Sequence, residues 1–308
     1  MTYAKLLFIE CVLREINKVV GDSEWFTNKS NSKVQINSII IYRTLSSEIV
    51  EKLEHSQSVY EIINWLKNRT IVAFKDKYGK NPEVGALNNA AGRWNEFIAT
   101  SLLSEIFFDL NQQNNSCIAI FSLPNSQLQS EGKDEVSSKF LSLFNSQQFM
   151  DGNELAKIAP FKNKIFLPSP DYIIVEMTNG NTFLSVQSLL KEQAKNPDNL
   201  AFYNQFKGTL QAKEVKAAVS LKTSNRPDRR YQPLFEAATI KAMAYILTQS
   251  WRYYMVASEL TSADRTIFST AVAPHGIVME QNFKLVDGTY LYNRKQDLMP
   301  LVEDALRK

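Results

Sequence analysis

The spacing of apolar residues predicts that the first third of the chain is helical. Residues 3–20 and 45–68 carry apolar side chains three or four positions apart, which is the period of a helix with one buried face. The segment 87–110 repeats this pattern and places Leu102 and Phe107 on its apolar side. We therefore expect amphipathic helices before the first strand.

The rest of the chain alternates between short apolar runs and helical patterns. We expect a helix at 232–250, because Pro233 falls in its first turn, and a hairpin at 283–293 around Asp287 and Gly288. Strands separated by helices favour a mixed α/β fold in which a central mixed sheet is flanked by helices. No linker is visible, so 1–308 is expected to form a single domain with a helical N-terminal portion at 1–80. The runs typical of buried strands lie at 116–123, 170–177, 212–222, 252–260 and 275–280.

The net charge of the chain does not by itself indicate nucleic-acid binding. Of its 308 residues 44% are hydrophobic and 22% are charged, and the net charge is only +3. That charge is too small to indicate nucleic-acid binding by itself, so any basic site must be local. The densest positive cluster contains Lys222, Arg226, Arg229 and Arg230, with Asp228 among them.

Cysteine and histidine usage argues against a disulfide framework and a zinc site. Cys11 and Cys117 lie in apolar surroundings, and His55 and His275 share no familiar zinc spacing with them. The N-terminal residues show neither a signal-peptide pattern nor a membrane-spanning run. These features predict a soluble, cytoplasmic protein without a membrane partner.

Two polar residues stand at the ends of two predicted strands. Asp171 opens one strand, and Lys222 closes another. If the strands are neighbours, a carboxylate and an ammonium meet at one sheet edge, as metal-assisted phosphodiester hydrolysis requires. One carboxylate binds magnesium poorly, so further acids are needed. Glu236, on the following helix, and Glu96, on a partly apolar helix face, are the candidates.

Each of these residues also has an ordinary explanation. Asp171 follows a proline at a common strand start, and Lys222 alone is a surface lysine. Glu236 alone would complement the dipole of its helix, and Glu96 alone would pair with Arg93, three residues earlier. The combination, rather than any single residue, indicates the chemistry.

The combination resembles a known family. Asp171, the triplet Ser-Leu-Lys at 220–222 and Glu236 resemble the PD-(D/E)xK nucleases, and in particular the type II restriction endonucleases that recognise CCGG. In that branch a serine replaces the acid two positions before the lysine, and a glutamate on the next helix takes over its role. The resemblance implies that Asp171 and Glu236 bind Mg²⁺ with help from Glu96, and that Ser220 supports the site by hydrogen bonding. Lys222 would stabilise the phosphate and its attacking water.

The same branch carries an Arg-x-Asp-Arg element four residues after the lysine, which matches Arg226, Asp228 and Arg229 here. Arginine bonds bidentately to guanine, and aspartate accepts from cytosine amino groups. These three side chains would therefore read one CC/GG half-site in the major groove. The alternative is that Asp228 only pairs with Arg229 in a solvated turn.

Three further residues are candidates for DNA contact. Arg230 has no counterpart in the element, and we expect a phosphate contact. Asn88 and Asn89 precede the face that carries Glu96, in a region that approaches the minor groove in the family. The alternative for both asparagines is helix capping.

The resemblance covers about residues 85–240, and it assigns 85–308 as a catalytic and DNA-recognition core. It implies Mg²⁺-dependent cleavage of double-stranded DNA at a palindrome containing CCGG, leaving 5′-phosphates and 5′ overhangs. A homodimer is the least assembly that cuts both strands, and related enzymes also form tetramers. Two alternatives stay open at this point. One is a CC/GG core interrupted by a central base, and the other is a non-catalytic DNA-binding module.

Overall fold

The computed structural model describes residues 22–29, 33–114, 116–124, 139–161, 170–177, 183–223 and 230–307. The chain divides into two compact units, Met1–Ala99 and Thr100–Lys308. The single domain predicted for 1–308 stays a prediction, and the helix predicted at 3–20 lies outside the described residues. Within the described ranges, no helix combines the length and the apolar composition that are needed to cross a membrane.

The first unit is mainly helical, as its apolar period predicts. Trp94 is fully buried, and its indole N–H donates to the carbonyl of Ser38 at 2.9 Å. The helix predicted at 45–68 is two helices, because Ser58 and Glu61 form a capping box that starts a new helix. The elements are η1 (Asp22–Trp25), the antiparallel pair β1 (Phe26–Asn28) and β2 (Val34–Ile36), α2 (Ser38–Thr44), α3 (Ser46–Glu54), α4 (Val59–Tyr78) and the start of α5 (Val84–Asn114).

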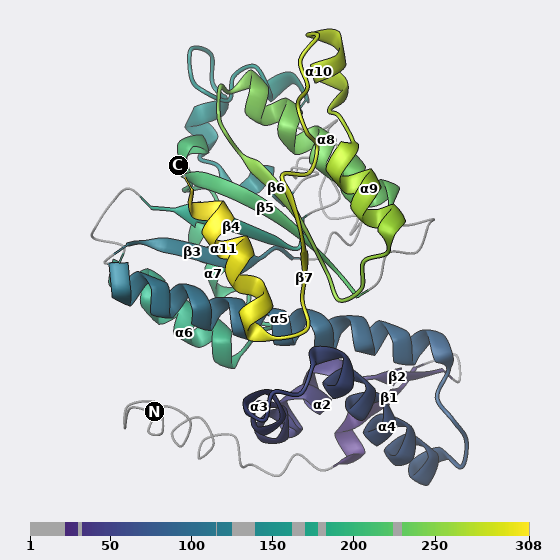
Figure 1. The fold of residues 1–308 in the computed structure, drawn as a ribbon. Coiled ribbons are helices and arrows are strands. Elements are labelled where there is room, and N and C mark those ends of the chain that lie inside the picture. The colour runs from purple at the N-terminus through teal and green to yellow at the C-terminus, as the bar shows by residue number, and fades with distance from the viewer. Residues whose placement is uncertain are drawn as a thin grey trace. The chain divides into compact units, whose positions relative to one another are not determined.

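The second unit is built on a five-stranded mixed sheet (Figure 1). Its strands follow the order β3-β4-β5-β6-β7, in which β3, β4 and β5 pair antiparallel and β5, β6 and β7 pair parallel. The predicted mixed α/β fold is confirmed, and the continuous apolar runs are explained by burial on both faces of the sheet. The strands are β3 (Ile118–Ser122), β4 (Tyr172–Glu176), β5 (Val215–Lys222), β6 (Arg252–Ala257) and β7 (Gly288–Leu291).

Helices cover both faces of this sheet. Along β6, Tyr253 points to Glu236, whereas the next residue, Tyr254, packs edge-on against Tyr290 at 5.7 Å, and the Tyr290 hydroxyl donates to Asp304. The helix that carries Glu236 and the helix that carries Asp304 therefore lie on opposite faces. The helices are α6 (Phe183–Lys195) and α7 (Ala201–Phe206) against β3, α8 (Tyr231–Ile246) against β6, α9 (Ser262–Thr270) against β7, and α11 (Met299–Leu306) against β5 and β7 (Figure 1). Short 3₁₀ turns lie at Leu141–Leu143, Ser146–Phe149, Ala159–Phe161, Ala212–Glu214 and Lys295–Leu298.

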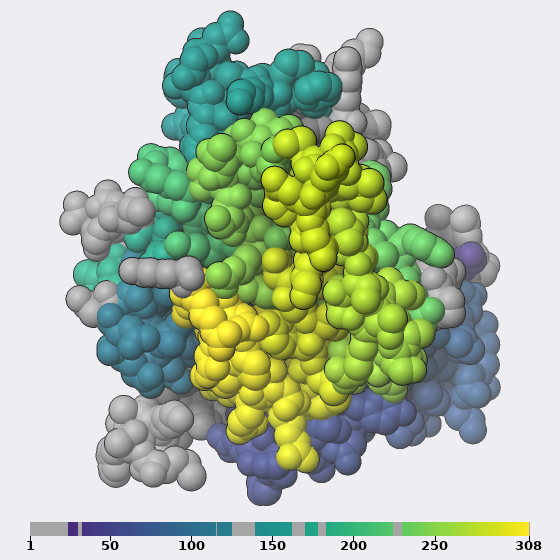
Figure 2. All heavy atoms as spheres, turned by 45° about the horizontal axis from the view of Figure 1, so that its top comes forward, coloured from purple at the N-terminus to yellow at the C-terminus, as the bar shows by residue number. Residues whose placement is uncertain are grey.

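The prediction of a strand at 275–280 is wrong. This segment forms the short helix α10 (Pro274–Val278), because Pro274 occupies its first turn. Ile277 and Val278 are 69% and 81% exposed, so these apolar side chains are not core residues. The space-filling view shows the yellow-green segment around α10 standing out from the surface of the second unit (Figure 2).

The hairpin predicted around Asp287 and Gly288 is also wrong. The chain does not reverse there, and β7 runs parallel to β6 at the edge of the sheet. The Asp287 carboxylate accepts from the backbone N–H of Tyr253 at 2.7 Å, and the Asp287 N–H donates to the Tyr253 carbonyl at 2.8 Å. Asp287 therefore ties the start of β7 to the start of β6.

Candidate active site

The pairing of β4 with β5 brings Asp171 to the end of β5. The two strands run antiparallel, with Tyr172 opposite Val219. Asp171 immediately precedes Tyr172, so it lies beside the C-terminal end of β5, where Lys222 is the last residue. Asp171 and Lys222 therefore meet at the ends of two neighbouring strands, as predicted.

Three groups of β5 donate to one oxygen of Asp171. The backbone N–H of Leu221 donates to Oδ2 at 2.6 Å, Nζ of Lys222 at 3.2 Å and the hydroxyl of Ser220 at 3.3 Å. The other carboxylate oxygen, Oδ1, accepts no hydrogen bond from a described residue and remains for a ligand. The side chains of Asp171 and Lys222 are each 23% exposed, so this cluster is open to solvent.

Glu236 belongs to the same cluster but is much more deeply buried. It is 3% exposed in the second turn of α8, and its Oε2 accepts from the hydroxyl of Tyr253 at 2.6 Å. The pKa of Glu236 is raised to about 8: burial raises it most, the hydrogen bond from Tyr253 lowers it, the charge of Asp171 raises it and that of Lys222 lowers it. Tyr253 shares one face of the sheet with Ser220 and Lys222, so Glu236 lies on the same face as the groups that hold Asp171.

The donor set fits a divalent cation that is shared with DNA. Among the residues that the structure describes, no three histidine, cysteine or acidic side chains form a metal site. Two carboxylates are nevertheless enough for Mg²⁺, which keeps several waters and binds substrate phosphate. A buried glutamate beside a second carboxylate is costly to ionise, and a bound cation would favour its ionised form.

The structure places Glu96, Asn88 and Asn89 in the first unit, all on α5. The Glu96 carboxylate pairs with the guanidinium of Arg93 at 2.6 Å, which is the ordinary interaction expected for it. The two asparagines are exposed, and α5 begins at Val84, so neither caps this helix. The metal role of Glu96 and the DNA contacts of the asparagines stay predictions.

The base-reading candidates Arg226, Asp228 and Arg229 lie outside the described residues, which resume at Arg230. The predicted roles of these three residues therefore stay predictions. The described structure shows what holds the chain on either side of 224–229. The chain leaves β5 at Lys222, bound to Asp171, and enters α8 after Arg230.

Arg230 is held by an internal ion pair. Its Nε lies 2.6 Å from Oδ1 of Asp264, and its Nη2 donates to the hydroxyl of Thr261 at 3.4 Å. The Asp264 side chain is 1% exposed. Burial raises the pKa of Asp264, but the hydrogen bonds from Thr261 and the ion pair with Arg230 outweigh that effect and lower it overall. The predicted phosphate contact of Arg230 stays a prediction, and its described partners lie within the protein.

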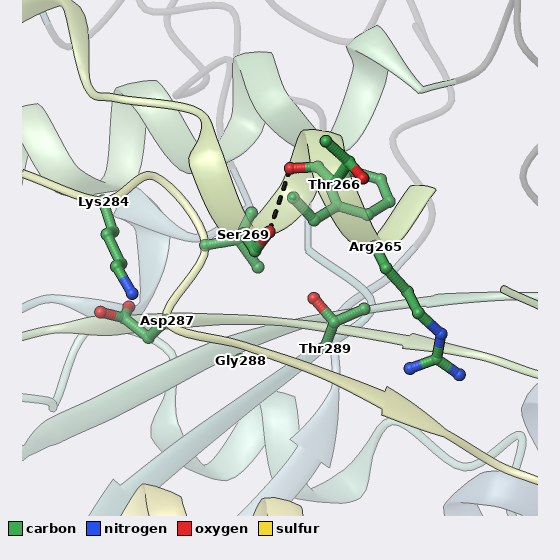
Figure 3. A pocket seen from close by; sticks show the side chains of 9 residues that line it. Arg265, Thr266, Ser269, Lys284, Asp287, Gly288 and Thr289 are labelled. Atoms are coloured by element: carbon green, nitrogen blue, oxygen red, sulfur yellow. Dashed lines mark hydrogen bonds between the residues drawn. The ribbon is translucent and has the colours of Figure 1, made fainter. Parts of the chain in front are cut away.

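A hollow of about 390 Å³ lies between α9 and β7, apart from this cluster. Figure 3 shows Lys284 pointing toward Asp287 and Arg265 lying near Thr289. Asp287 forms an ion pair at 2.5 Å with Lys241, which does not line the hollow. None of its lining residues is a predicted site residue. These are Arg265, Thr266, Phe268, Ser269, Lys284, Val286, Asp287, Gly288 and Thr289.

Comparison with known proteins assigns the family. The family described as Cfr10I/Bse634I restriction endonuclease matches residues 23–308. The chain belongs to this family. A curated member of similar sequence is the type II restriction enzyme Cfr10I of Citrobacter freundii, 24% identical over 264 residues that cover 80% of this chain and 85% of that enzyme.

Solved structures of the Cfr10I/Bse634I family share the fold. The crystal structure of the type IIF restriction endonuclease Bse634I with cognate DNA superposes with a TM-score of 0.69 and 20% identity, covering 91% of this chain and 96% of that one. A second structure, Bse634I restriction endonuclease, gives a TM-score of 0.67 and 19% identity, covering 92% and 97%. The predicted restriction-endonuclease-like fold is confirmed.

Membership of the Cfr10I/Bse634I family also confirms the predicted enzyme class. The chain is a type II restriction endonuclease, which is a site-specific deoxyribonuclease. Enzymes of this kind generally use divalent metal ions. The prediction of this class from positions 171, 220, 222 and 236 together with the 226–229 element is therefore correct at the level of the family.

Sequence reasoning missed two residues that contact predicted site residues, namely Tyr253 beside Glu236 and Asp264 beside Arg230. Tyr253 gives no local signal, because a tyrosine in an apolar strand has the same pattern whether or not its hydroxyl serves an acid. Asp264 could have been found, because Thr-x-x-Asp at 261–264 is the sequence of a capping box and α9 begins there. Its pairing with Arg230 could not have been found from sequence spacing.

The raised pKa of Glu236 makes metal-free stability depend on pH. Between the ordinary value of 4.5 and about 8, the unfolded chain has released the Glu236 proton while the folded protein keeps it. The free energy of unfolding should therefore fall as pH rises through this window and level off above it. We expect Glu236→Gln to flatten this part of the curve and to be more stable than wild type near pH 8 by a few kcal/mol.

Chemical denaturation in chelator at several pH values measures both curves. Glu176→Gln is the control, because Glu176 is an exposed acid of the same sheet and pairs with Lys216 at 2.6 Å. A Glu236→Gln curve parallel to the wild-type curve would contradict the assignment.

Proposed function

We propose that this restriction endonuclease hydrolyses double-stranded DNA with Mg²⁺ at a palindromic site containing CCGG, leaving 5′-phosphates and 5′ overhangs. The observation that carries the proposal is the convergence of Ser220, Leu221 and Lys222 on one oxygen of Asp171, with Glu236 buried on the same face of the sheet. A structural salt bridge needs one donor, whereas three donors on one oxygen orient the carboxylate and leave its other oxygen for a ligand.

Asp171 and Glu236 are the residues that would hold the metal ion, and Glu96 is a further candidate. When bound, Mg²⁺ polarises the scissile phosphate and makes a water molecule more acidic. Asp171 offers Oδ1 while Oδ2 stays with its three donors. Glu236 offers a carboxylate whose burial penalty a cation would remove.

Lys222 supplies the positive charge of the site. Its ammonium is fixed 3.2 Å from Asp171 and is 23% exposed, so it can reach a phosphate that approaches from solvent. There it stabilises the negative charge that develops on the phosphoryl oxygens and orients the attacking water. Ser220 is 1% exposed, and its hydroxyl keeps Asp171 in place.

Arg226, Asp228 and Arg229 are proposed as the base readers. Their support is the chain path: they fall between Lys222 of the cutting cluster and Arg230, whose ion pair with Asp264 holds the start of α8. Two arginines on guanines and one aspartate on cytosine amino groups would read CC/GG.

Other DNA contacts are proposed at the edges of this element. Arg230 would reach a phosphate only if its guanidinium kept a free N–H beside Asp264 and Thr261. Asn88 and Asn89 are exposed amides that could check the central pairs from the minor groove.

Duplex DNA and a homodimer follow from the same proposal. The relative solved with cognate DNA supports a duplex substrate. One copy of the element reads one half-site, so a palindrome requires two copies that are related by a two-fold axis. A homotetramer would repeat this arrangement.

Incubation of the wild-type protein with plasmid DNA tests the proposal. We expect linear product with Mg²⁺ and none with chelator, because the two carboxylates alone cannot activate water. Sequencing of the product ends identifies the recognised core sequence. Cleavage before an uninterrupted CCGG supports the proposal, whereas cleavage at CC-N-GG would show that the recognised site is the interrupted one. Absence of cleavage on DNA rich in CCGG contexts would refute it.

Lys222→Ala should lower the cleavage rate by at least about 100-fold while DNA binding persists, because charge stabilisation is needed only during hydrolysis. Lys216→Ala is the matched control: Lys216 lies on the same strand, and its partner is Glu176 rather than Asp171. Single-turnover cleavage and gel-shift assays measure the two properties. Equal rates for the two variants would exclude the role given to Lys222.

Asp228→Ala should weaken specific binding by about 1–3 kcal/mol per lost base contact and relax the preference for CC/GG. Competition between cognate and altered duplexes measures this loss. Asp198→Ala serves as a control acid remote in sequence from the element. Normal binding and cutting by Asp228→Ala would show that this residue does not read bases.

A further inference from the structure

Each carboxylate of the cutting cluster accepts from a buried hydroxyl group. The Tyr253 hydroxyl donates to Oε2 of Glu236 at 2.6 Å. The Ser220 hydroxyl donates to Oδ2 of Asp171 at 3.3 Å. Tyr253 is 0% exposed and Ser220 is 1% exposed. Both hydroxyls are therefore closed to solvent, one beside Glu236 and the other beside Asp171.

The sheet register explains why Tyr253 faces the cutting cluster. In the parallel pairing of β5 with β6, Ala218 lies beside Tyr253, and Ser220 follows two residues later on the same face. This face is the one that α8 covers, since Glu236 meets Tyr253 there. Tyr253 therefore holds Glu236 on the face of the sheet that also carries Ser220, which donates to Asp171.

The contact with Tyr253 determines which oxygen of Glu236 is available. The phenol occupies Oε2, and no described residue donates to Oε1. A carboxylate held at one oxygen cannot rotate freely, so Oε1 keeps one direction. In metal sites, the partners that hydrogen-bond a ligating carboxylate typically change metal affinity by about 10- to 100-fold when they are removed.

We propose that Tyr253 is a positioning residue of the nuclease: it holds Glu236 in the orientation that binds the metal ion. This inference rests on the proposed function, because it requires that Glu236 and Asp171 bind the ion. Tyr253 does not touch DNA or the reacting atoms, and it acts only through the carboxylate.

Tyr253→Phe in the full-length protein tests the inference, because it removes the hydroxyl and keeps the ring. We expect Mn²⁺ binding, measured by electron paramagnetic resonance without DNA, to weaken by about 10- to 100-fold. The Mg²⁺ concentration for half-maximal cleavage should rise by a similar factor, and the rate should recover at saturating Mg²⁺. DNA binding in chelator should be unchanged.

Tyr254→Phe is the matched control. Tyr254 is the next residue on β6 and is 1% exposed, but it faces the opposite side of the sheet, where its ring packs against Tyr290. Its variant should bind Mn²⁺ like wild type. If Tyr253→Phe binds Mn²⁺ and responds to Mg²⁺ like wild type, Tyr253 has only a packing role and the inference is overturned.

A double-mutant cycle with Glu236→Gln tests the route of the effect. If Tyr253 acts through Glu236, Tyr253→Phe should not weaken Mn²⁺ binding further in the Glu236→Gln background. Additive losses would overturn the inference. Should Tyr253→Phe not fold, Tyr253→Met also removes the donor to Glu236, and wild-type Mn²⁺ binding by that variant would overturn the inference as well.

The proposed function and this inference fail in different ways. A wild-type protein that does not cleave DNA with Mg²⁺ removes the proposed function. A wild-type protein that does cleave, together with a Tyr253→Phe variant of unchanged metal dependence, removes only the role of Tyr253.

Discussion

The register between β4 and β5 is the constraint on which the cutting cluster depends. Side chains alternate along a strand, so a slip of one residue would turn Ser220 and Lys222 to the other face and remove them from Asp171. The hydrogen bond from the Leu221 N–H to Asp171, at 2.6 Å, ties this register to the site itself, because a backbone donor cannot change its place without the strand. The same hydrogen bond therefore fixes the pairing of β4 with β5 and orients the Asp171 carboxylate.

The second acid is supplied by a helix, and this has a physical cost. Glu236 lies at 3% exposure on α8, where an isolated carboxylate is unfavourable and its pKa is raised to about 8. A glutamate on a strand beside Lys222 would have met solvent and the ammonium directly. Its place on the helix instead requires a partner from β6, and Tyr253 provides the hydrogen bond. The cluster thus draws on three strands and one helix of the second unit.

The sequence predicts most of the sheet and the central residues of the cluster, for identifiable reasons. β3 to β6 are buried apolar runs, and their short length and flanking residues distinguish them from helices. Asp171 stands just before β4, and Lys222 is the last residue of β5. The failures occur where apolar residues are not core residues, as at Ile277 and Val278, or where an Asp-Gly pair ties strands together instead of turning the chain. Tyr253 could not be assigned from the sequence, because its role depends on α8 packing beside it. No local sequence pattern indicates that contact.

The ion pair of Arg230 with Asp264 gives the connection between β5 and α8 a fixed span. One end is fastened at Lys222 by Asp171, and the other is fastened at Arg230 by a carboxylate in the capping box of α9. Lys222 and Arg230 are thus fastened by contacts that do not involve residues 224–229. A substitution within 224–229 would therefore leave the ion pairs of Lys222 and Arg230 in place.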